Sequence, residues 1–403
     1  MARKDNRGRN LRTGETQRSD GRYCFRYTDP CTKKRHTIYN TDLAKLREQE
    51  KQILRDLEDG IAVGAEAKNM DVNQLFERYL SIRQLADSTK VNYQIMWDHH
   101  VREGLGTMRI VAVRPSHIKA LYAGMSRADY ARTTIKTIHN LLHPAFEMAV
   151  EDDLIRKNPA NHALRDYGRD PKEREALSLE QQRALLVFVE QSNIYQRYLP
   201  MLQIMIGLAL RVGETIGLTW DDVSIPDREV VIDHQLVYKK RGDGFKLYVS
   251  TPKTDAGIRT LHMTQIVKKA FLKQREYQMA QGPVEKAVID GKTNFIFTGR
   301  NGLPMMPSAV NNVLYNIVDA YNEEEKLRAK KARRKPVLLP KISCHILRHT
   351  GCTRMAETGM DPKVLQYIMG HANIAVTMEV YNHITGTERI EKEIRKLDEL
   401  MVV

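Results

Sequence analysis

After a polar, basic stretch, the chain alternates between apolar and polar side chains from residue 23 and changes to a helical pattern after residue 41. In YCFRYT, Tyr23, Phe25 and Tyr27 alternate with other residues, and this period of two predicts a strand with one aromatic face. An Asp-Pro turn follows, and KRHTIYN predicts a second strand. Thr41 is expected to cap a helix whose apolar stripe is Leu43, Leu46, Ile53, Leu54 and Leu57. Residues 1–66 are therefore predicted to form a small sheet backed by one helix.

Helical periodicity dominates the next block, residues 70–165, which follows a stretch at 60–69 that we interpret as a hinge. Apolar spacing predicts helices in VNQLFERYLSIRQL, PSHIKALYAGM and ARTTIKTIHNLLHPAFEMAVEDDLI. A further helix, DSTKVNYQIMWDHHV, is predicted to begin at Asp87 and Ser88, whose side chains can cap it. The block is expected to be wholly helical.

The third block, residues 174–403, follows a polar linker and mixes helices with a few strands. The segments EVVIDHQLVYKK, FKLYVSTPK and GIRTLHM predict three strands, joined by turns at 242–244 and 255–257. The last nineteen residues place apolar side chains at helical spacing between charges, at Ile390, Ile394, Leu397 and Met401. The predicted fold class is mainly α with small β-sheets, an α+β chain in three parts.

The net charge of the chain indicates what kind of molecule it binds. The 403-residue chain has a net charge of +14 and a pI near 9.5, which favours a polyanion. Residues 1–40 contain eleven Lys or Arg against four Asp or Glu, which is half of the excess, and KLRAKKARRK at 326–335 has seven basic residues in ten. Either run could equally be a solvated surface.

Other sequence signals exclude several classes of protein. Cysteines 24, 31, 344 and 352 match no usual zinc spacing and are too few for a disulfide framework, so we expect a reducing bacterial cytoplasm. The basic N-terminus lacks the apolar stretch of a signal peptide, and no run is long enough to span a membrane. No Walker loop or dinucleotide fingerprint is present, and no cofactor or metal is expected.

Six residues of the third block form a set whose chemistry suits phosphoryl transfer to a tyrosine. A phosphodiester carries negative charge that grows during displacement, and guanidinium groups offer charged, planar donors that match it. A phenol, with an ordinary pKa of about 10, needs assistance before it can attack. The six lie in LALRVGE, TPKTDAGIR, HILRHT and MGHANIAVTMEVY, and are Arg211, Lys253, His345, Arg348, His371 and Tyr381.

In order and spacing, these residues resemble the catalytic set of the tyrosine recombinases, the phage-integrase family, and most closely that of the integrases of conjugative transposons. The ten positions from His371 to Tyr381 are a specific part of the match. The family usually has Thr-Gly before the Leu-Arg pair, where this chain has Leu208 and Ala209. It commonly has Leu before the glycine of MGH, where this chain has Met369.

The resemblance implies a role for each of the six residues. Tyr381 would attack the scissile phosphate of DNA and form a covalent 3′-phosphotyrosine, with His345 as general base. Lys253 would protonate the leaving 5′-oxygen. The phosphate would be bound by Arg211, Arg348 and His371. His349, which shares the HILRHT helix, is interpreted as structural.

The resemblance also implies domains and partners. Residues 1–66 would be an arm-site DNA-binding domain with a three-stranded sheet, 70–165 a helical core-binding domain, and 174–403 the catalytic domain. Double-stranded DNA would be the substrate, bound by a homotetramer with the help of an excision factor and a host DNA-bending protein. Candidate DNA contacts are Arg22, Arg26, Lys33, Lys34, Arg35, Lys90, Arg132 and Lys136.

Alternative interpretations stay open at this point. The chain could be a catalytically silent architectural or regulatory DNA-binding protein, and the first block could be an ordinary small β domain. A type IB topoisomerase would share the chemistry, whereas a metal-dependent transposase would need a carboxylate cluster in place of a basic phosphate pocket. The C-terminal stripe could pack on a neighbouring subunit, as in related recombinases, or on its own domain.

Overall fold

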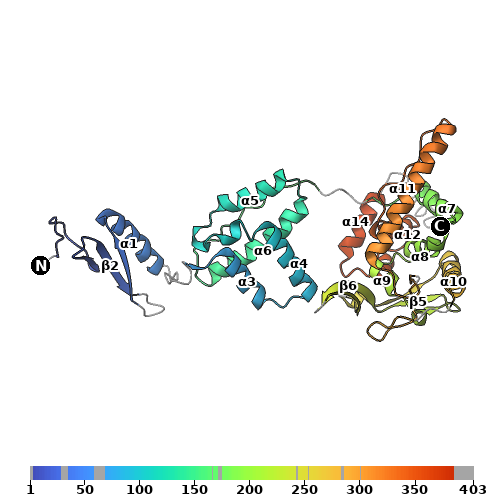
Figure 1. Cartoon of the computed structure of the whole chain (residues 1–403), viewed down its shortest axis with the longest axis horizontal. Helices are drawn as coiled ribbons and strands as arrows, with labels where there is room; N and C mark the ends of the chain where they lie inside the picture. The colour runs from blue at the N-terminus through green and yellow to red at the C-terminus, as the bar shows by residue number, and fades with distance from the viewer. Residues whose placement is uncertain are drawn as a thin grey trace, which may run out of the picture. The chain divides into compact units, whose positions relative to one another are not determined.

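The chain folds into two compact units, residues 1–172 and 173–403. The computed structural model, drawn in Figure 1, describes residues 3–28, 35–58, 69–165, 167–170, 175–241, 244–252, 254–282, 286–299 and 301–384. The predicted hinge, apart from Asn69, and the C-terminal stripe beyond residue 384 lie outside these residues. None of the described helices is long and apolar enough to cross a membrane.

The N-terminal segment is a three-stranded antiparallel sheet covered on one face by a helix. The order is β1-β2-β3, with strands Glu15–Gln17, Tyr23–Thr28 and Arg35–Asn40, and α1 spans Leu43–Glu58. The predicted aromatic face is confirmed, because the side chains of Tyr23, Phe25 and Tyr27 are buried with the apolar stripe of α1. β1 had no pattern of its own in the sequence, although the family resemblance implied a third strand.

Two details of the predicted helix were wrong. Asp42 caps α1 in place of Thr41, since its Oδ1 accepts a hydrogen bond from the Ala44 amide at 2.7 Å. Leu54 is 42% exposed, so it does not belong to the buried stripe. The other residues of the predicted stripe, Leu43, Leu46, Ile53 and Leu57, pack in the core of this segment.

The regular elements of the middle segment are all helices in the described residues, as predicted, although the last one ends at Glu151 and the residues after it form turns. Its core includes Phe76 and Trp97, whose rings stack with centroids 3.8 Å apart. The predicted cap at Asp87 and Ser88 was wrong. The N-cap residue of α4 is Ala86, whose methyl group cannot accept a hydrogen bond. The elements are α3 (Val72–Ile82), α4 (Asp87–His100), η1 (Leu105–Thr107), η2 (Ile110–Ala112), α5 (Pro115–Arg127) and α6 (Arg132–Glu151).

The C-terminal unit packs helices around a large apolar core and a smaller apolar cluster, and it carries two small sheets. The sheets have the orders β4-β5-β8 and β6-β7. Their strands are β4 (Val223–Ser224), β5 (Glu229–Ile232), β6 (Gln235–Arg241), β7 (Gly244–Ser250) and β8 (Arg259–His262). The helices are α7 (Leu179–Gln191), η3 (Gln196–Tyr198), α8 (Leu199–Gly207), α9 (Val212–Gly217), η4 (Trp220–Asp222), η5 (Asp255–Gly257), α10 (Gln265–Ala280), α11 (Pro307–Lys331), α12 (Cys344–Glu357), α13 (Pro362–Met369) and α14 (Ile374–Ile384).

The three strands predicted in this unit do not form one sheet. The segment EVVIDHQLVYKK divides into β5 and β6, which belong to different sheets, and β8 pairs with β5 instead of following β7 in a ladder. The division falls at Asp233 and His234. The His234 ring is buried, and its Nε2 lies 2.8 Å from the Gly217 carbonyl oxygen. The chain passes from one sheet to the other at this buried side chain.

Candidate active site

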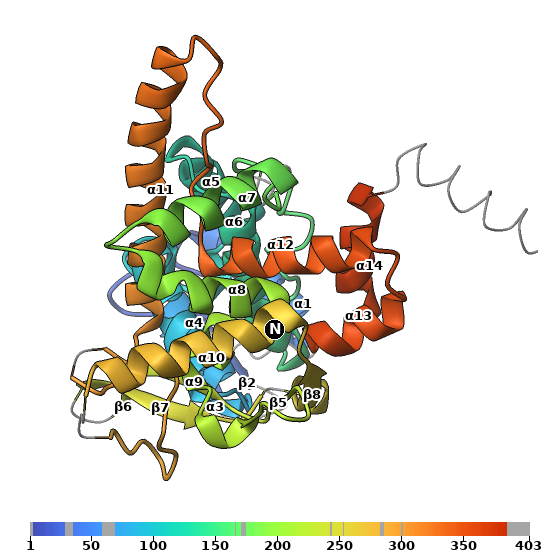
Figure 2. The ribbon, with the colours of Figure 1, turned by 90° about the vertical axis from the view of Figure 1, so that its right-hand side faces the viewer.

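A cavity of about 810 Å³ lies where α12, α13 and α14 meet. Figure 2 shows these three helices side by side at one edge of the unit. The cavity walls include His345, Arg348 and His349 from α12 and His371 from the turn after α13. The HILRHT segment therefore presents both of its histidines and its arginine to one space, as the helical spacing predicts.

Arg348 is the buried charge of this cavity, with only 4% of the residue exposed. Its Nη1 donates a hydrogen bond to the Ala209 carbonyl at 2.7 Å, and its Nη2 donates to the Met369 carbonyl. Burial, and then the charge of Arg211, lowers the pKa of Arg348 to about 9. The guanidinium therefore stays charged at neutral pH, held by main-chain oxygens.

Arg211 stands at the start of α9, and a buried carboxylate aligns it. Its Nη1 lies 2.8 Å from Glu214 Oε1, and its Nη2 donates to the Gly370 carbonyl at 3.2 Å. The Arg211 side chain is 40% exposed, whereas that of Glu214 is 3% exposed. Burial alone would raise the pKa of Glu214, but the hydrogen bonds and charge of Arg259, followed by Arg211, lower it overall. Glu214 is thus an ionised support for the arginines.

The departure from the family pattern before Arg211 has a structural consequence. Ala209 has a φ of +48°, in the left-handed region where glycine is favoured. This conformation turns the Ala209 carbonyl toward Arg348, which donates to it. The family's glycine suits this conformation, and the alanine keeps it at a small cost in strain.

His371 follows Gly370, which ends α13 in the left-handed conformation with a φ of +59°. Its Nε2 lies 3.3 Å from Arg348 Nη2, and its Nδ1 lies 3.0 Å from the Thr377 hydroxyl. Because a guanidinium can only donate, Nε2 accepts and the ring proton is assigned to Nδ1. Burial, with the charges of Arg348 and Arg211, lowers the pKa of His371 to about 4, so the ring is neutral at pH 7.

Tyr381 lies on α14 and is 8% exposed. Its hydroxyl donates a hydrogen bond to the Met360 carbonyl, and its ring belongs to an apolar cluster with Leu365 and Met369. The neighbouring Val380 lines the cavity, but Tyr381 is not among the lining residues. The structure thus joins Arg211, Arg348 and His371 in one network and places His345 on the wall. The Tyr381 hydroxyl is hydrogen-bonded to the Met360 carbonyl oxygen. Lys253 lies outside the described residues.

Two buried residues of the network were missed by the sequence analysis. Glu214 follows Arg211 by three positions, and a lone acid in the apolar segment VGETIG was the available signal. Arg259 shares the buried face of β8 with Leu261, so the period of two could have identified it as buried. Arg259 contacts Glu214 at 3.0 Å.

The candidate DNA contacts are distributed over the first unit. Arg26 and Arg35 are exposed, and their register places them on the sheet face opposite the aromatic one. Arg22 pairs with Asp20 at 2.7 Å. Arg132 pairs with Asp170 at 3.1 Å. The remaining candidates are Lys90 and Lys136, which are exposed, and Lys33 and Lys34, which lie outside the described residues.

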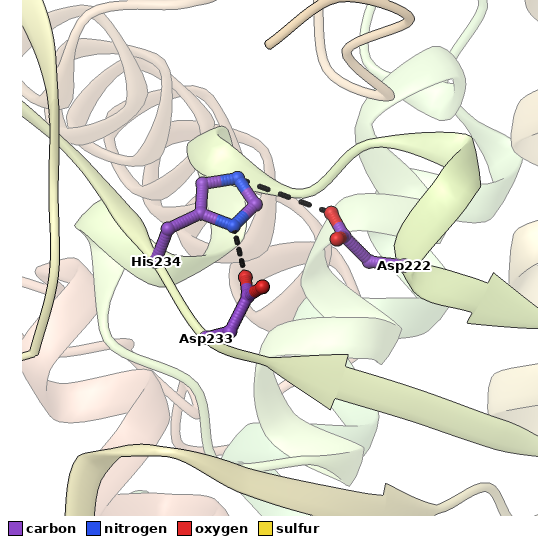
Figure 3. A group of neighbouring side chains, drawn as sticks. All are labelled: Asp222, Asp233 and His234. Atoms are coloured by element: carbon purple, nitrogen blue, oxygen red, sulfur yellow. Dashed lines mark hydrogen bonds and ion pairs between the residues drawn. The ribbon is translucent and has the colours of Figure 1, made fainter. Parts of the chain in front are cut away.

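Asp222, Asp233 and His234 gather their ligand-type atoms within 4.8 Å of one another, as Figure 3 shows. Both ring nitrogens of His234 already face protein oxygens, Nδ1 that of Asp233 and Nε2 that of Gly217. The Lys292 ammonium lies 3.7 Å from both carboxylates. A metal ion would have to displace these partners, so the group fits a structural ion cluster that fixes the junction of β5 and β6.

Comparison with known proteins finds similarity to integrases and transposases along most of the chain. The model of the phage integrase family matches residues 175–388, and that of the DNA-binding domain of Tn916 integrase matches residues 1–57. The chain is 34% identical over 400 residues to the transposase from transposon Tn916 of Enterococcus faecalis, covering 95% of this chain and 94% of that protein. The Tn1545 transposase of Streptococcus pneumoniae matches to the same extent.

Solved structures agree with these sequence matches. The Tn1549 transposon integrase in complex with a circular intermediate DNA is similar, with a TM-score of 0.72 and 31% identity over 82% of this chain and all of that chain. A lambda integrase dimer bound to a core site matches with a TM-score of 0.52 and 17% identity, covering 92% of this chain and 95% of that chain. The latter supports the fold alone.

Proposed function

Since the chain belongs to the phage integrase family, the tyrosine recombinases, we propose that the Arg348 cavity is its DNA-cleavage site and that Tyr381 is the nucleophile. The chain is an integrase of the conjugative-transposon type, a DNA strand transferase. The observation that carries the assignment of the site is the network of Arg211, Arg348 and His371 at the end of α13.

The arginines would bind the non-bridging oxygens of the scissile phosphate. Arg211 is partly exposed and Arg348 lines the cavity, so both can offer N–H groups to an incoming phosphate without leaving their carbonyl partners. Such preorganised donors stabilise the charge that develops in the transition state. His371 would join them by donating from Nε2, which requires the tautomer with its proton on that nitrogen once phosphate engages Arg348.

The phenol must leave Met360 before it can attack. About one part in a thousand of a free phenol with a pKa of about 10 is ionised at pH 7, so removal of its proton has to be assisted. We assign this step to His345, which lies on the cavity wall. The phenol oxygen would form a bond to phosphorus as the bond to the 5′-oxygen breaks, leaving a 3′-phosphotyrosine.

The released 5′-oxygen needs a proton, and we assign its donation to Lys253. The phosphotyrosine keeps the energy of the broken ester, so a 5′-hydroxyl from another strand can attack it and restore a phosphodiester. No nucleotide hydrolysis is required. Cutting and rejoining in this way excises and integrates a mobile element.

We propose that three segments share the DNA. Residues 1–66 would bind arm sites through the free face of the sheet, 70–165 would bind core sites, and 174–403 would perform the chemistry. The exposed Arg26 and Arg35 support the first assignment. We further propose that four chains assemble on double-stranded DNA through the C-terminal tail, helped by an excision factor and a host DNA-bending protein.

A trapping experiment tests the function. The full chain and Tyr381→Phe are incubated with a nicked suicide duplex that carries the element end, and the products are separated on a denaturing gel. A covalent adduct that needs the phenol and persists in EDTA is expected. Tight binding without any adduct would favour a silent DNA-binding protein.

A further inference from the structure

Three arginines meet at the C-terminal end of α13. Carbonyl groups at a helix C-terminus lack intrahelical partners and carry the negative end of the helix dipole, so they attract cations. Here three consecutive carbonyls each accept from a different guanidinium. The carbonyls are those of Ile368, Met369 and Gly370, and their donors are Arg259, Arg348 and Arg211, respectively.

Arg259 differs from the other two in having no access to solvent. Its side chain is 0% exposed, and all three of its nitrogens have partners. Nη1 and Nη2 donate to the two oxygens of Glu214 at 3.2 and 3.0 Å, and Nη1 also donates to the Gly257 carbonyl at 2.9 Å. Nε donates to Ile368 at 2.7 Å. Four of its five N–H donors are thus used within the protein, and the buried side chain does not line the cavity, so it is not placed to bind a phosphate there.

The Arg259 side chain also lies directly beneath the turn that presents His371. A Cβ placed on Gly370 would stand 3.0 Å from Arg259 Nη1 and 3.2 Å from its Cζ. The left-handed φ of Gly370, +59°, adds a second reason for glycine at this position. The turn therefore packs directly against the Arg259 guanidinium, and the position of that group fixes the position of His371.

We propose that Arg259 is a positioning residue for strand cleavage, acting through Glu214 and the end of α13 and not on the scissile phosphate itself. Through Glu214 it fixes Arg211, and through the Ile368 carbonyl it fixes the turn that carries His371. This inference rests on the proposed function, because Arg259 would hold in place the phosphate-binding donors of the proposed cleavage site.

A planar fork is required at this position. Lysine keeps the charge but offers one ammonium group, which cannot hold both Glu214 oxygens and the Ile368 and Gly257 carbonyls at once. In Arg259→Lys the phosphate-binding groups would be displaced by a fraction of an ångström to an ångström, and such misplacement costs about 100-fold in rate. DNA binding depends on many other contacts and would change little.

The experiment compares two nicked suicide duplexes, one with an ordinary scissile phosphodiester and one with a methylphosphonate at that position. The methyl group replaces a charged oxygen, so the neutral centre depends less on well-placed arginines. Single-turnover adduct formation is measured for the full wild-type chain, Arg259→Lys and Arg259→Gln, below the melting temperature of each. The control is Arg334→Lys, because Arg334 also pairs with a buried glutamate, Glu325, but contributes nothing to the cavity.

We expect Arg259→Lys to form the adduct about 100-fold more slowly on the phosphodiester and less than about 10-fold more slowly on the methylphosphonate. Its DNA affinity should stay within about threefold of wild type, and Arg334→Lys should cleave normally. Equal losses on both substrates, or a wild-type rate for Arg259→Lys and Arg259→Gln, would overturn the positioning role. A wild-type chain that forms no adduct would instead overturn the proposed function.

Discussion

The arginines of the proposed cleavage cavity and those of the N-terminal sheet hold the same side chain in opposite ways. Arg348 is 4% exposed and is held by main-chain carbonyls that cannot move independently. Arg22 and Arg26 are exposed. Arg22 contacts Asp20 and the Tyr39 ring, whose centroid lies 5.7 Å from its guanidinium carbon. Groups that act on reacting atoms need fixed geometry, whereas groups that bind backbone phosphates work through charge.

The largest expected effect comes from removing the buried arginine. Arg348→Ala should slow adduct formation about 1,000-fold, because it removes a charged donor to the scissile phosphate. Its DNA affinity should stay within about threefold of wild type. Single-turnover cleavage and a binding titration measure the two quantities on the same duplex. If affinity fell as steeply as the rate, Arg348 would be a binding residue like those of the sheet, and the comparison would break.

A smaller effect is expected on how the stability of the chain depends on pH, because burial and the charges of nearby arginines lower the pKa of His371. The pKa of His371 falls from 6.5 to about 4 in the folded chain, so between these values the unfolded chain binds more protons. Stability is therefore fully present above about pH 6.5 and declines as pH falls toward 4. We expect His371 to account for about 1 kcal/mol between pH 6.5 and 5, after allowance for its partial exposure.

Thermal melting at several pH values checks this expectation. The difference between wild type and His371→Asn should grow as pH falls, whereas His262→Asn, which alters a surface histidine 77% exposed, should leave the profile unchanged. A difference that is constant with pH would mean that the arginine cluster does not control this ring.

On the sheet, single substitutions should have a modest and salt-dependent effect. Arg26→Ala should weaken binding to DNA carrying the element's arm sites by about 3- to 10-fold at 0.15 M salt and reduce the salt slope by about 1. The cleavage rate of the bound complex should not change. Lys51→Ala, on the exposed side of α1, is the control. A loss in cleavage without a loss in binding would show that the two regions do not divide the work.

The smallest effect is expected at the residue that departs from the family pattern. Ala209→Gly relieves the left-handed strain, worth about 1 kcal/mol, but removes a buried methyl group worth about 0.8 kcal/mol. Its stability should stay within about 1 kcal/mol of wild type. Ala209→Val should destabilise the chain by more than about 2 kcal/mol, because a branched side chain is far less tolerant of this conformation. Urea or thermal unfolding distinguishes the pair, and equal losses would contradict the backbone explanation.

The same contrast explains how far the sequence could be interpreted. Local patterns predicted the aromatic face of β2 and placed His345 and Arg348 on one side of a helix, because spacing along one element fixes which side chains share a face. Arg211 and His371 were identified through the family resemblance. The pairing of β5 with β8, the capping of α13 by arginines and the contact of Tyr381 with Met360 join residues far apart in the chain. No local pattern encodes such contacts.

Glu214 and Arg259 show where that boundary lies. Each is a charged residue in an apolar setting, which signals burial with a partner. The identity of the partner follows only from the fold, since 45 positions separate the two residues. The sequence therefore indicated which groups we propose for the chemistry, and the structure was needed to find what holds them.

The most direct test of the account is to locate the covalent bond. Adduct trapped on the suicide duplex is digested with protease and nuclease, and the nucleotide-bearing peptide is sequenced by mass spectrometry. A single modified peptide is expected, with the 3′-phosphate on Tyr381. Attachment to another residue, such as the exposed Tyr367, would contradict the assignment of the nucleophile and of the cavity in which it acts.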